Sequence, residues 1–320
     1  MQLRQLGTSD IFVSPVALGC WPITGMTTLD AVREESLKTI QAALDAGINF
    51  LDTAYAYGIE GESEQMIGEI IHHRRDDVVV ATKGGLHRVG AAQEYDARPD
   101  TIQRECDESL QRLGTDHVEL YYLHAPDPRT PIQDTAGAIA ELIRQGKVRA
   151  AGASNLSLTQ LMEFHAVCPL TAVQPHFNML QQEIEQDIAP WCRQNSISLC
   201  VYWPLMKGLL AGRLPRDHVF DPRDGRAKYP MFQGEEWQKN QNFLDDLRLI
   251  ATDEGCTVSQ LVVAWTISRP GITSALCGAK RDWQIHETAA AMSRPLSAAA
   301  QQQIDAAIKR RGPSISRAAV

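Results

Sequence analysis

Four reactive side chains lie at or just after the ends of three short apolar segments. Asp52, Lys83 and His124 each end such a segment, and Tyr57 follows Asp52 by five residues. An acid, a phenol, an amine and an imidazole together can donate a proton and stabilise negative charge on an oxygen. Each residue alone has an ordinary explanation as a cap, a surface charge or a structural residue. Their recurrence at three neighbouring segment ends favours a catalytic site.

Short apolar segments separated by amphipathic stretches predict eight strands alternating with helices. The strands are mostly without alternation, as expected when both faces are covered. This pattern favours an α/β fold of the closed (β/α)8 TIM-barrel type over an open doubly wound sheet, and it places the reactive residues at the open top face. The predicted strands are residues 16–19, 48–52, 78–83, 118–124, 148–154, 171–174, 197–202 and 273–278.

Local signals mark several helix ends. Asp100 is expected to cap a helix that Gly114 ends. Ser157 with Gln160, and Thr257 with Gln260, have the spacing of capping boxes.

Two segments depart from the strand and helix alternation. Residues 3–14 predict an N-terminal β-hairpin that turns near Ser9 and Asp10 and closes the bottom of the barrel. Residues 206–242, rich in Gly, Pro and charge, predict a long insertion after strand seven that acts as a lid or binding loop; a plain surface excursion is the alternative.

Composition limits the class of protein. The 320 residues, 44% hydrophobic and 22% charged, are expected to form a single domain over 1–320. A formal charge of -8 argues against nucleic acid and anionic membranes as partners. With no apolar run near the roughly 20 residues of a membrane span and no apolar signal core at the start, we expect a cytoplasmic protein. The seven scattered cysteines lack C-x-x-C spacing, so we predict buried thiols and no metal site.

Ordered motifs along almost the whole chain resemble the aldo-keto reductase superfamily. They include Gly19-Cys-Trp21, the segment from Ala46 to Gly58, Ala81-Thr-Lys83, Ser109-Leu-Gln-Arg-Leu-Gly-Thr-Asp116, Leu123-His124, Ser154-Asn155, Val173-Gln174, Pro204-Leu205, Gly208-Leu-Leu and Gly278-Ala-Lys280. The resemblance implies a (β/α)8 barrel in which a nicotinamide cofactor reduces a carbonyl. It assigns catalysis to Asp52, Tyr57, Lys83 and His124.

The chemistry of these four residues is consistent with carbonyl reduction. A carbonyl becomes an alkoxide as hydride arrives, so the site must supply a proton. We expect Tyr57 to be that donor, made more acidic by the Lys83 ammonium, while Asp52 keeps Lys83 charged. His124 is expected to orient the carbonyl oxygen.

No G-x-G-x-x-G follows a strand, so a Rossmann site is not indicated. The resemblance implies that Ser154, Asn155 and Gln174 contact the carboxamide and that Tyr202 lies beneath the nicotinamide. Lys280 and Arg281 stand where many members of that family hold the adenosine 2'-phosphate, so the resemblance favours NADP(H) over NADH. Trp203 and Thr288 depart from the family pattern, so their contacts are not carried over. The remaining cofactor contacts implied by resemblance are Trp21, Asp52, Pro204, Leu205, Gly208, Leu209, Arg226, Gly278, Gln284 and Glu287.

The substrate is expected to be a small carbonyl or alcohol, with Trp21, Tyr55, Met206 or Phe232 lining an apolar mouth. The natural substrate, the direction of reaction and the oligomeric state, including a homo-oligomer, stay open. Two alternatives also stay open. Lys83 could form a Schiff base in an aldolase, or the protein could be a cofactor-occupied binding or regulatory subunit with little turnover.

Overall fold

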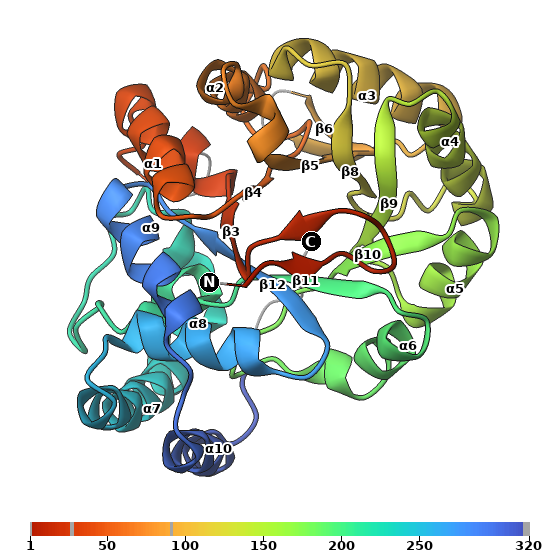
Figure 1. The fold of residues 1–320 in the computed structure, drawn as a ribbon. Helices are drawn as coiled ribbons and strands as arrows, with labels where there is room; N and C mark the ends of the chain where they lie inside the picture. Colours follow the sequence, from red (N-terminus) through yellow and green to blue (C-terminus); the bar gives the residue numbers. More distant parts are fainter. Residues whose placement is uncertain (1, 26–28, 90–91, 316–320) are drawn as a thin grey trace.

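A computed structural model describes residues 2–25, 29–89 and 92–315. Eight parallel strands close into a barrel in the order β10-β11-β12-β3-β4-β5-β8-β9 (Figure 1). Each strand falls on a predicted segment, within two residues at either end. The strands are β3 (Val16–Gly19), β4 (Phe50–Asp52), β5 (Val79–Gly84), β8 (Val118–Leu123), β9 (Val148–Ser154), β10 (Leu170–Gln174), β11 (Ser198–Tyr202) and β12 (Ile272–Gly278).

Helices surround the barrel (Figure 1). Both predicted capping boxes are confirmed, at Ser157 and Thr257. The prediction that Asp100 caps a helix is wrong, because the helix begins at Pro99 and Asp100 lies in its first turn, but Gly114 does end it. The helices are α1 (Arg33–Asp45), α2 (Glu62–Ile71), α3 (Pro99–Leu113), α4 (Ile132–Arg144), α5 (Leu158–Val167), α6 (Ile188–Gln194), α7 (Gly234–Asp253), α8 (Val258–Ser268), α9 (Asp282–Ala289) and α10 (Ala298–Arg311).

Alternate residues of each strand face the barrel interior, and this alternation positions the reactive side chains. Ala17, Phe50, Ala81, Leu120 and Tyr122 pack together in the interior cluster, whereas their sequence neighbours pack against the helices. Side chains two residues apart lie on the same face of a strand. Two positions after Phe50, Ala81 and Tyr122, at the carboxyl ends of the strands, come the reactive residues. Asp52, Lys83 and His124 therefore lie on the interior side of the barrel.

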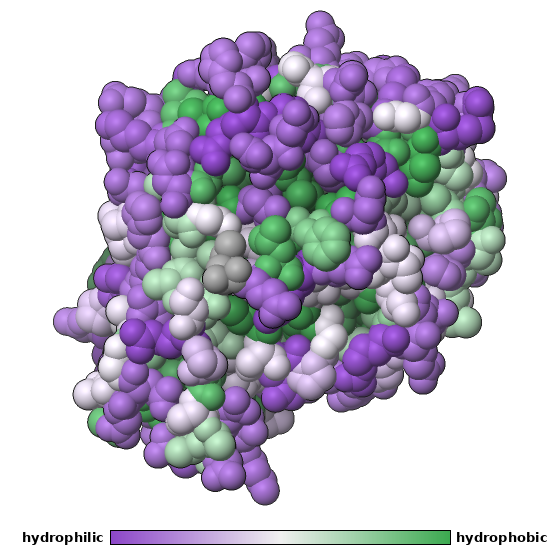
Figure 2. All heavy atoms as spheres, in the orientation of Figure 1, coloured by the Kyte–Doolittle hydropathy of each residue, from purple (hydrophilic) through white to green (hydrophobic). Residues whose placement is uncertain are grey.

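The N-terminal hairpin is confirmed. Strands β1 (Arg4–Gln5) and β2 (Phe12–Val13) pair antiparallel, and Leu6, Ile11 and Val13 belong to the interior cluster. The hairpin lies across the centre of the barrel end that faces the viewer in Figure 1. Figure 2 shows this face with hydrophobic residues near its centre and mostly hydrophilic residues around them. The apolar residues of the hairpin therefore fill the bottom of the barrel, opposite the carboxyl ends of the strands.

Two features after the strands differ from the prediction. A second hairpin, β6 (Leu86–Val89) with β7 (Ala92–Tyr95), follows β5 and was not predicted. The insertion after β11 is confirmed in position but is shorter, because α7 begins at Gly234. Up to that helix it holds the short 3-10 turns at Met206–Ala211, Gly225–Lys228 and Pro230–Phe232.

Within the described part of the chain, no helix combines the length and apolarity that crossing a bilayer requires.

Candidate active site

The carboxyl ends of β4, β5 and β8 bring the four predicted catalytic residues together. Lys83 Nζ donates to Asp52 Oδ1 at 2.6 Å and to the carbonyl oxygen of Thr53 at 2.7 Å. The same nitrogen lies 3.4 Å from the Tyr57 hydroxyl. The rings of Tyr57 and His124 pack edge to face, with their centres 5.8 Å apart. An amine, a carboxylate, a phenol and an imidazole thus share one site at the top of the barrel.

The pair of Asp52 and Lys83 is buried. Their side chains are 2% and 1% exposed, so neither charge is solvated by bulk water. Burial raises the pKa of Asp52, although the Lys83 charge and hydrogen bonds from Lys83 and Gln174 oppose that rise. Buried opposite charges in contact stabilise each other's charged form. The Schiff-base alternative needs a free neutral amine at Lys83, and this ion pair disfavours it.

The pKa of Tyr57 is raised rather than lowered overall, and the acidifying effect expected of the Lys83 ammonium stays a prediction. Burial, and then the negative charge of Asp52, raise the pKa of Tyr57 well above its usual value. Lys83 lies closer to Asp52 than to the Tyr57 hydroxyl, so the carboxylate offsets the ammonium charge felt by the phenol. Tyr57 therefore keeps its proton at neutral pH, as a proton donor must.

His124 is a neutral, incompletely paired histidine. Burial and the charge of Lys83 hold its pKa well below the usual range. Its side chain is buried, and Nδ1 has no hydrogen-bond partner among the described residues. Buried polar atoms without partners are uncommon in folded proteins. A nitrogen of this kind beside the Tyr57 ring suits a small polar ligand.

A chain of hydrogen bonds joins β4 to β9, β10 and β11. Gln174 Nε2 donates to Asp52 Oδ2 at 2.6 Å, and Ser154 Oγ donates to the carbonyl oxygen of Gln174 at 2.8 Å. Asn155 Nδ2 donates to the His124 carbonyl oxygen, and the Tyr202 hydroxyl donates to Asn155 Oδ1 at 2.7 Å. Asn155 has a φ of 59°, a strained value that these bonds help to hold. These predicted cofactor residues therefore lie beside the reactive four.

A second group of predicted residues gathers at the end of β12 and the start of α9. Lys280 Nζ donates to the Leu29 carbonyl oxygen, and Arg281 Nη2 donates to the Asp30 carbonyl oxygen. Gln284 Oε1 accepts from the backbone nitrogens of Lys280 and Arg281. Burial, then the positive charge of Arg226, lower the pKa of Lys280, with a smaller lowering from Arg281. Glu287 Oε1 accepts a hydrogen bond from Arg213 Nη2 at 2.7 Å, and the two side chains form an ion pair.

The turn after β11 carries the remaining predicted contacts. Gly208 has a φ of 89°, and a Cβ there would lie 3.5 Å from Arg226 Nη1. Arg226 is itself paired with Asp224. Sequence reasoning missed Lys207, whose Nζ lies 4.3 Å from the centre of the Trp203 ring, because such stacking depends on the turn's shape. The other residues predicted in these two groups are Pro204, Leu205 and Leu209, in the turn, and Gly278, which ends β12.

Of the residues predicted to line an apolar mouth, one lies beside the reactive four. Trp21 packs edge to face on Tyr57 with ring centres 5.0 Å apart. Tyr55 instead stacks on Arg112 of α3 and donates to Glu108, so it faces the helix layer. Met206 is fully buried, and Phe232 packs against Phe220. Trp21 therefore packs on the ring of the proposed proton donor, whereas Tyr55 is turned toward α3.

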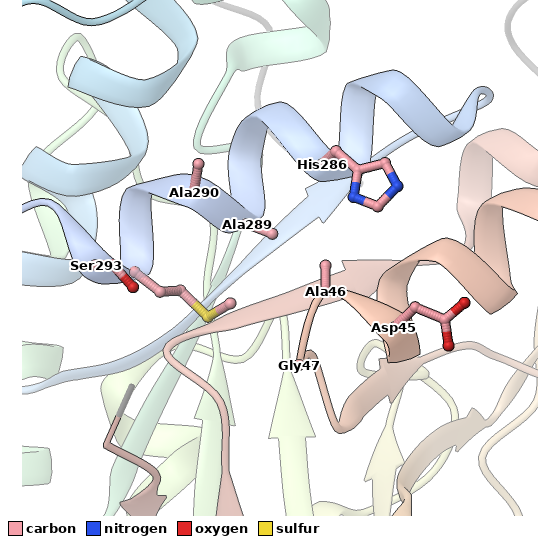
Figure 3. Close-up of a pocket in the computed structure, with 8 residues that line it drawn as sticks. Asp45, Ala46, Gly47, His286, Ala289, Ala290 and Ser293 are labelled. Carbon is pink, nitrogen blue, oxygen red and sulfur yellow. The ribbon is translucent and has the colours of Figure 1, made fainter.

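A separate cavity of about 430 Å³ lies between the end of α1 and α9 (Figure 3). Its lining contains none of the predicted site residues. The cavity lining consists of Asp45, Ala46, Gly47, His286, Ala289, Ala290, Met292 and Ser293.

Among the residues that the structure describes, no cluster of three or more His, Cys, Asp or Glu side chains could hold a metal ion.

Comparisons with known proteins agree with this geometry. The model of the aldo/keto reductase family matches residues 15–309. The chain is 36% identical over 288 residues to the aldo-keto reductase YhdN of Bacillus subtilis, covering 89% of this chain and 87% of that protein. It is 35% identical over 313 residues to the NADH-specific methylglyoxal reductase of Escherichia coli, covering 93% and 95%.

Solved structures give the same result. The structure of the glycerol dehydrogenase AKR11B4 from Gluconobacter oxydans superposes with a TM-score of 0.91 at 32% identity, covering 99% of this chain and 98% of that one. The holo form of the aldo-keto reductase AKR11C1 from Bacillus halodurans gives a TM-score of 0.80 at 26% identity, covering 100% and 98%. The family match spans most of the sequence and the fold agrees from end to end, so this chain belongs to the aldo/keto reductase family.

Proposed function

We propose that this protein reduces an aldehyde or ketone to the alcohol with NADPH, and that Tyr57 is the general acid. The observation that carries the proposal is the contact of Lys83 with both Asp52 and Tyr57 in a buried site. Membership of the family gives the coarser activity, that of a nicotinamide-dependent oxidoreductase acting on carbonyls. A bound nicotinamide supplies the hydride.

The residues of the chain have distinct proposed roles. The high pKa of Tyr57 keeps its hydroxyl protonated until the carbonyl oxygen gains negative charge. Lys83 then stabilises the phenolate that proton donation leaves behind. Asp52 holds Lys83 in place, and Gln174 holds the other oxygen of Asp52. Neutral His124 donates a hydrogen bond that orients the carbonyl oxygen.

The chemistry of the donor set fits a dinucleotide. Ser154, Asn155 and Gln174 offer amide and hydroxyl groups for a carboxamide, and the Tyr202 ring offers a flat support. Lys280, Arg281 and Arg226 form a positive group suited to a phosphate. The further cofactor contacts that we propose are Trp21, Asp52, Pro204, Leu205, Gly208, Leu209, Gly278, Gln284 and Glu287.

The test is turnover of a panel of aldehydes and ketones with NADPH, followed by the absorbance of the reduced nicotinamide. Methylglyoxal belongs in the panel, and glycerol in the oxidative direction, because two relatives are named for these compounds. Reduction of any carbonyl supports the proposal. Tight NADPH binding with no turnover on any substrate would favour a cofactor-occupied regulatory subunit instead.

The preference for NADPH depends on the positive group at the end of β12. We expect Lys280→Ala with Arg281→Ala to weaken NADPH binding by roughly 10- to 100-fold, because charge-assisted hydrogen bonds to a phosphate are lost. NADH affinity should be nearly unchanged. Fluorescence titration with each cofactor measures both dissociation constants. Arg223→Ala is the matched control, since Arg223 is a neighbouring exposed cation paired with Asp221.

An equal loss of affinity for both cofactors would show that the pair does not read the additional phosphate. The relative from Escherichia coli that is named NADH-specific makes this outcome a real alternative. It would leave the catalytic proposal intact.

A further inference from the structure

The segment that carries Tyr57 connects β4 to α2 and is fastened from two sides. On the barrel side, the backbone nitrogen of Tyr55 donates to the Lys83 carbonyl oxygen at 3.0 Å, and the Thr53 nitrogen donates to the Ala81 carbonyl oxygen at 2.8 Å. These bonds fix the beginning of the segment to β5. Further along, the Tyr57 nitrogen donates to the Ala54 carbonyl oxygen at 3.0 Å, and the Ser63 nitrogen donates to the Tyr57 carbonyl oxygen at 3.3 Å. The outer side of the segment packs against α3.

Arg112 of α3 fastens the outer side. Its Nη1 donates to the Tyr55 carbonyl oxygen at 3.3 Å, and its guanidinium lies 4.2 Å from the centre of the Tyr55 ring. The Tyr55 hydroxyl donates to Glu108, one helical turn before Arg112. A planar guanidinium can lie over an aromatic ring while its N–H groups donate hydrogen bonds within the guanidinium plane. Tyr55 is therefore held through both its backbone and its side chain.

Glu64 links this contact to the strand that carries Lys83. It is fully buried and accepts a hydrogen bond from Thr82 Oγ1 at 2.6 Å, and its other oxygen accepts from Arg112 Nη1 at 3.2 Å. Thr82 is adjacent to Lys83 in β5. One carboxylate thus connects the neighbour of Lys83 with the arginine that holds the Tyr57 segment.

The turn at Gly61 packs closely against the Arg112 side chain. Gly61 has a φ of 79°, and a Cβ built there would lie 2.6 Å from Arg112 Nε. The turn therefore packs directly on the guanidinium, with no room for a side chain. The Arg112 side chain is only 20% exposed, although arginine is usually a surface residue.

We propose that Arg112, anchored by Glu64, is a positioning residue that sets the distance between the Tyr57 hydroxyl and Lys83. It acts through Tyr55 and does not touch the reacting atoms. The proposal rests on the proposed function, in which Tyr57 donates the proton. Displacement of a reacting group by about 1 Å can cost roughly 10²-fold in rate. Arg112 is thus a determinant of the proton-transfer step.

The test compares Arg112→Met with the wild-type protein in carbonyl reduction. We expect kcat to fall by roughly 10- to 100-fold, while cofactor affinity stays close to that of wild type, because only the position of the proton donor changes. The solvent deuterium isotope effect on kcat should rise, since proton transfer becomes slower relative to the other steps. Arg112→Lys, which keeps the charge, should recover part of kcat.

Arg104→Met is the matched control. Arg104 lies on the same helix and pairs with the same Glu108 at 3.8 Å, but it is half exposed, and the guanidinium on the Tyr55 ring is that of Arg112. It should keep wild-type kcat and isotope effect. If Arg112→Met does not fold, Glu64→Gln retains an acceptor for Thr82 and serves as the second variant, with the same expected changes.

Wild-type kcat and an unchanged isotope effect in Arg112→Met, or a loss confined to KM, would overturn the proposal. The result is separable from failure of the proposed function through Tyr57→Phe measured in the same assay. If Tyr57→Phe loses activity and Arg112→Met does not, only the positioning role is wrong. If Tyr57→Phe keeps its activity, the general-acid assignment itself is wrong.

Discussion

Replacing Tyr57 by Phe should cut carbonyl reduction by roughly 10²- to 10⁴-fold, the usual contribution of a positioned general acid. The substitution removes the hydroxyl that lies 3.4 Å from Lys83 Nζ and leaves the ring that packs on Trp21 and His124. Cofactor affinity should therefore be nearly unchanged. Steady-state turnover and fluorescence titration with NADPH measure the two quantities separately.

A control for Tyr57→Phe is Tyr55→Phe, which removes a phenol hydroxyl from the same segment. The Tyr55 hydroxyl donates to Glu108 and does not point toward Lys83. Any effect of this variant should be small beside that of Tyr57→Phe. Unaltered turnover in Tyr57→Phe would remove Tyr57 from the role of proton donor, and equal losses in both variants would point to disturbance of the segment instead.

Lys83→Met should damage both activity and stability. Asp52 would remain buried without its partner at 2.6 Å, and breaking a buried ion pair in this way costs about 3–5 kcal/mol of the free energy of unfolding. Reduction should fall by roughly 10²-fold or more, because the phenolate that proton donation leaves behind loses its neighbouring ammonium. Denaturant unfolding and steady-state turnover measure the two effects.

The double variant Asp52→Asn with Lys83→Met separates the two effects. It buries no net charge, and Asn at position 52 can still accept from Gln174, so most of the lost stability should return. Activity should stay low. Arg33→Met, which removes an exposed ion pair with Glu69, is the surface control. A Lys83→Met protein as stable as wild type would show that the buried pair is not held as described.

The barrel could be predicted because its strands are covered on both faces and are therefore short, apolar and regularly spaced. The positions of Asp52, Lys83 and His124 followed from the same segments, since the carboxyl ends of parallel strands meet at one face. The capping boxes at Ser157 and Thr257 are local hydrogen-bond patterns, so a few residues of sequence were sufficient to predict them.

Other properties depend on distances that sequence spacing does not specify. The pKa of Tyr57 is raised first by burial and then by the charge of Asp52, and both depend on how the folded chain surrounds the phenol. The orientation of Tyr55 toward α3 depends on Arg112, which is far away in the sequence. The start of α3 at Pro99 rather than after Asp100 reflects the preference of Pro for the first helical turn.

Side chains alternate between the two faces of each strand, and this alternation limits where the sequence can gain or lose residues during evolution. Deleting one residue within β5 would turn Lys83 toward the surrounding helices and Thr82 or Gly84 toward the interior. Length changes in the connections that follow the strands impose no such inversion. Natural variants and engineered libraries should therefore accumulate insertions in the connections, where substrate range can change while the interior chemistry is inherited intact.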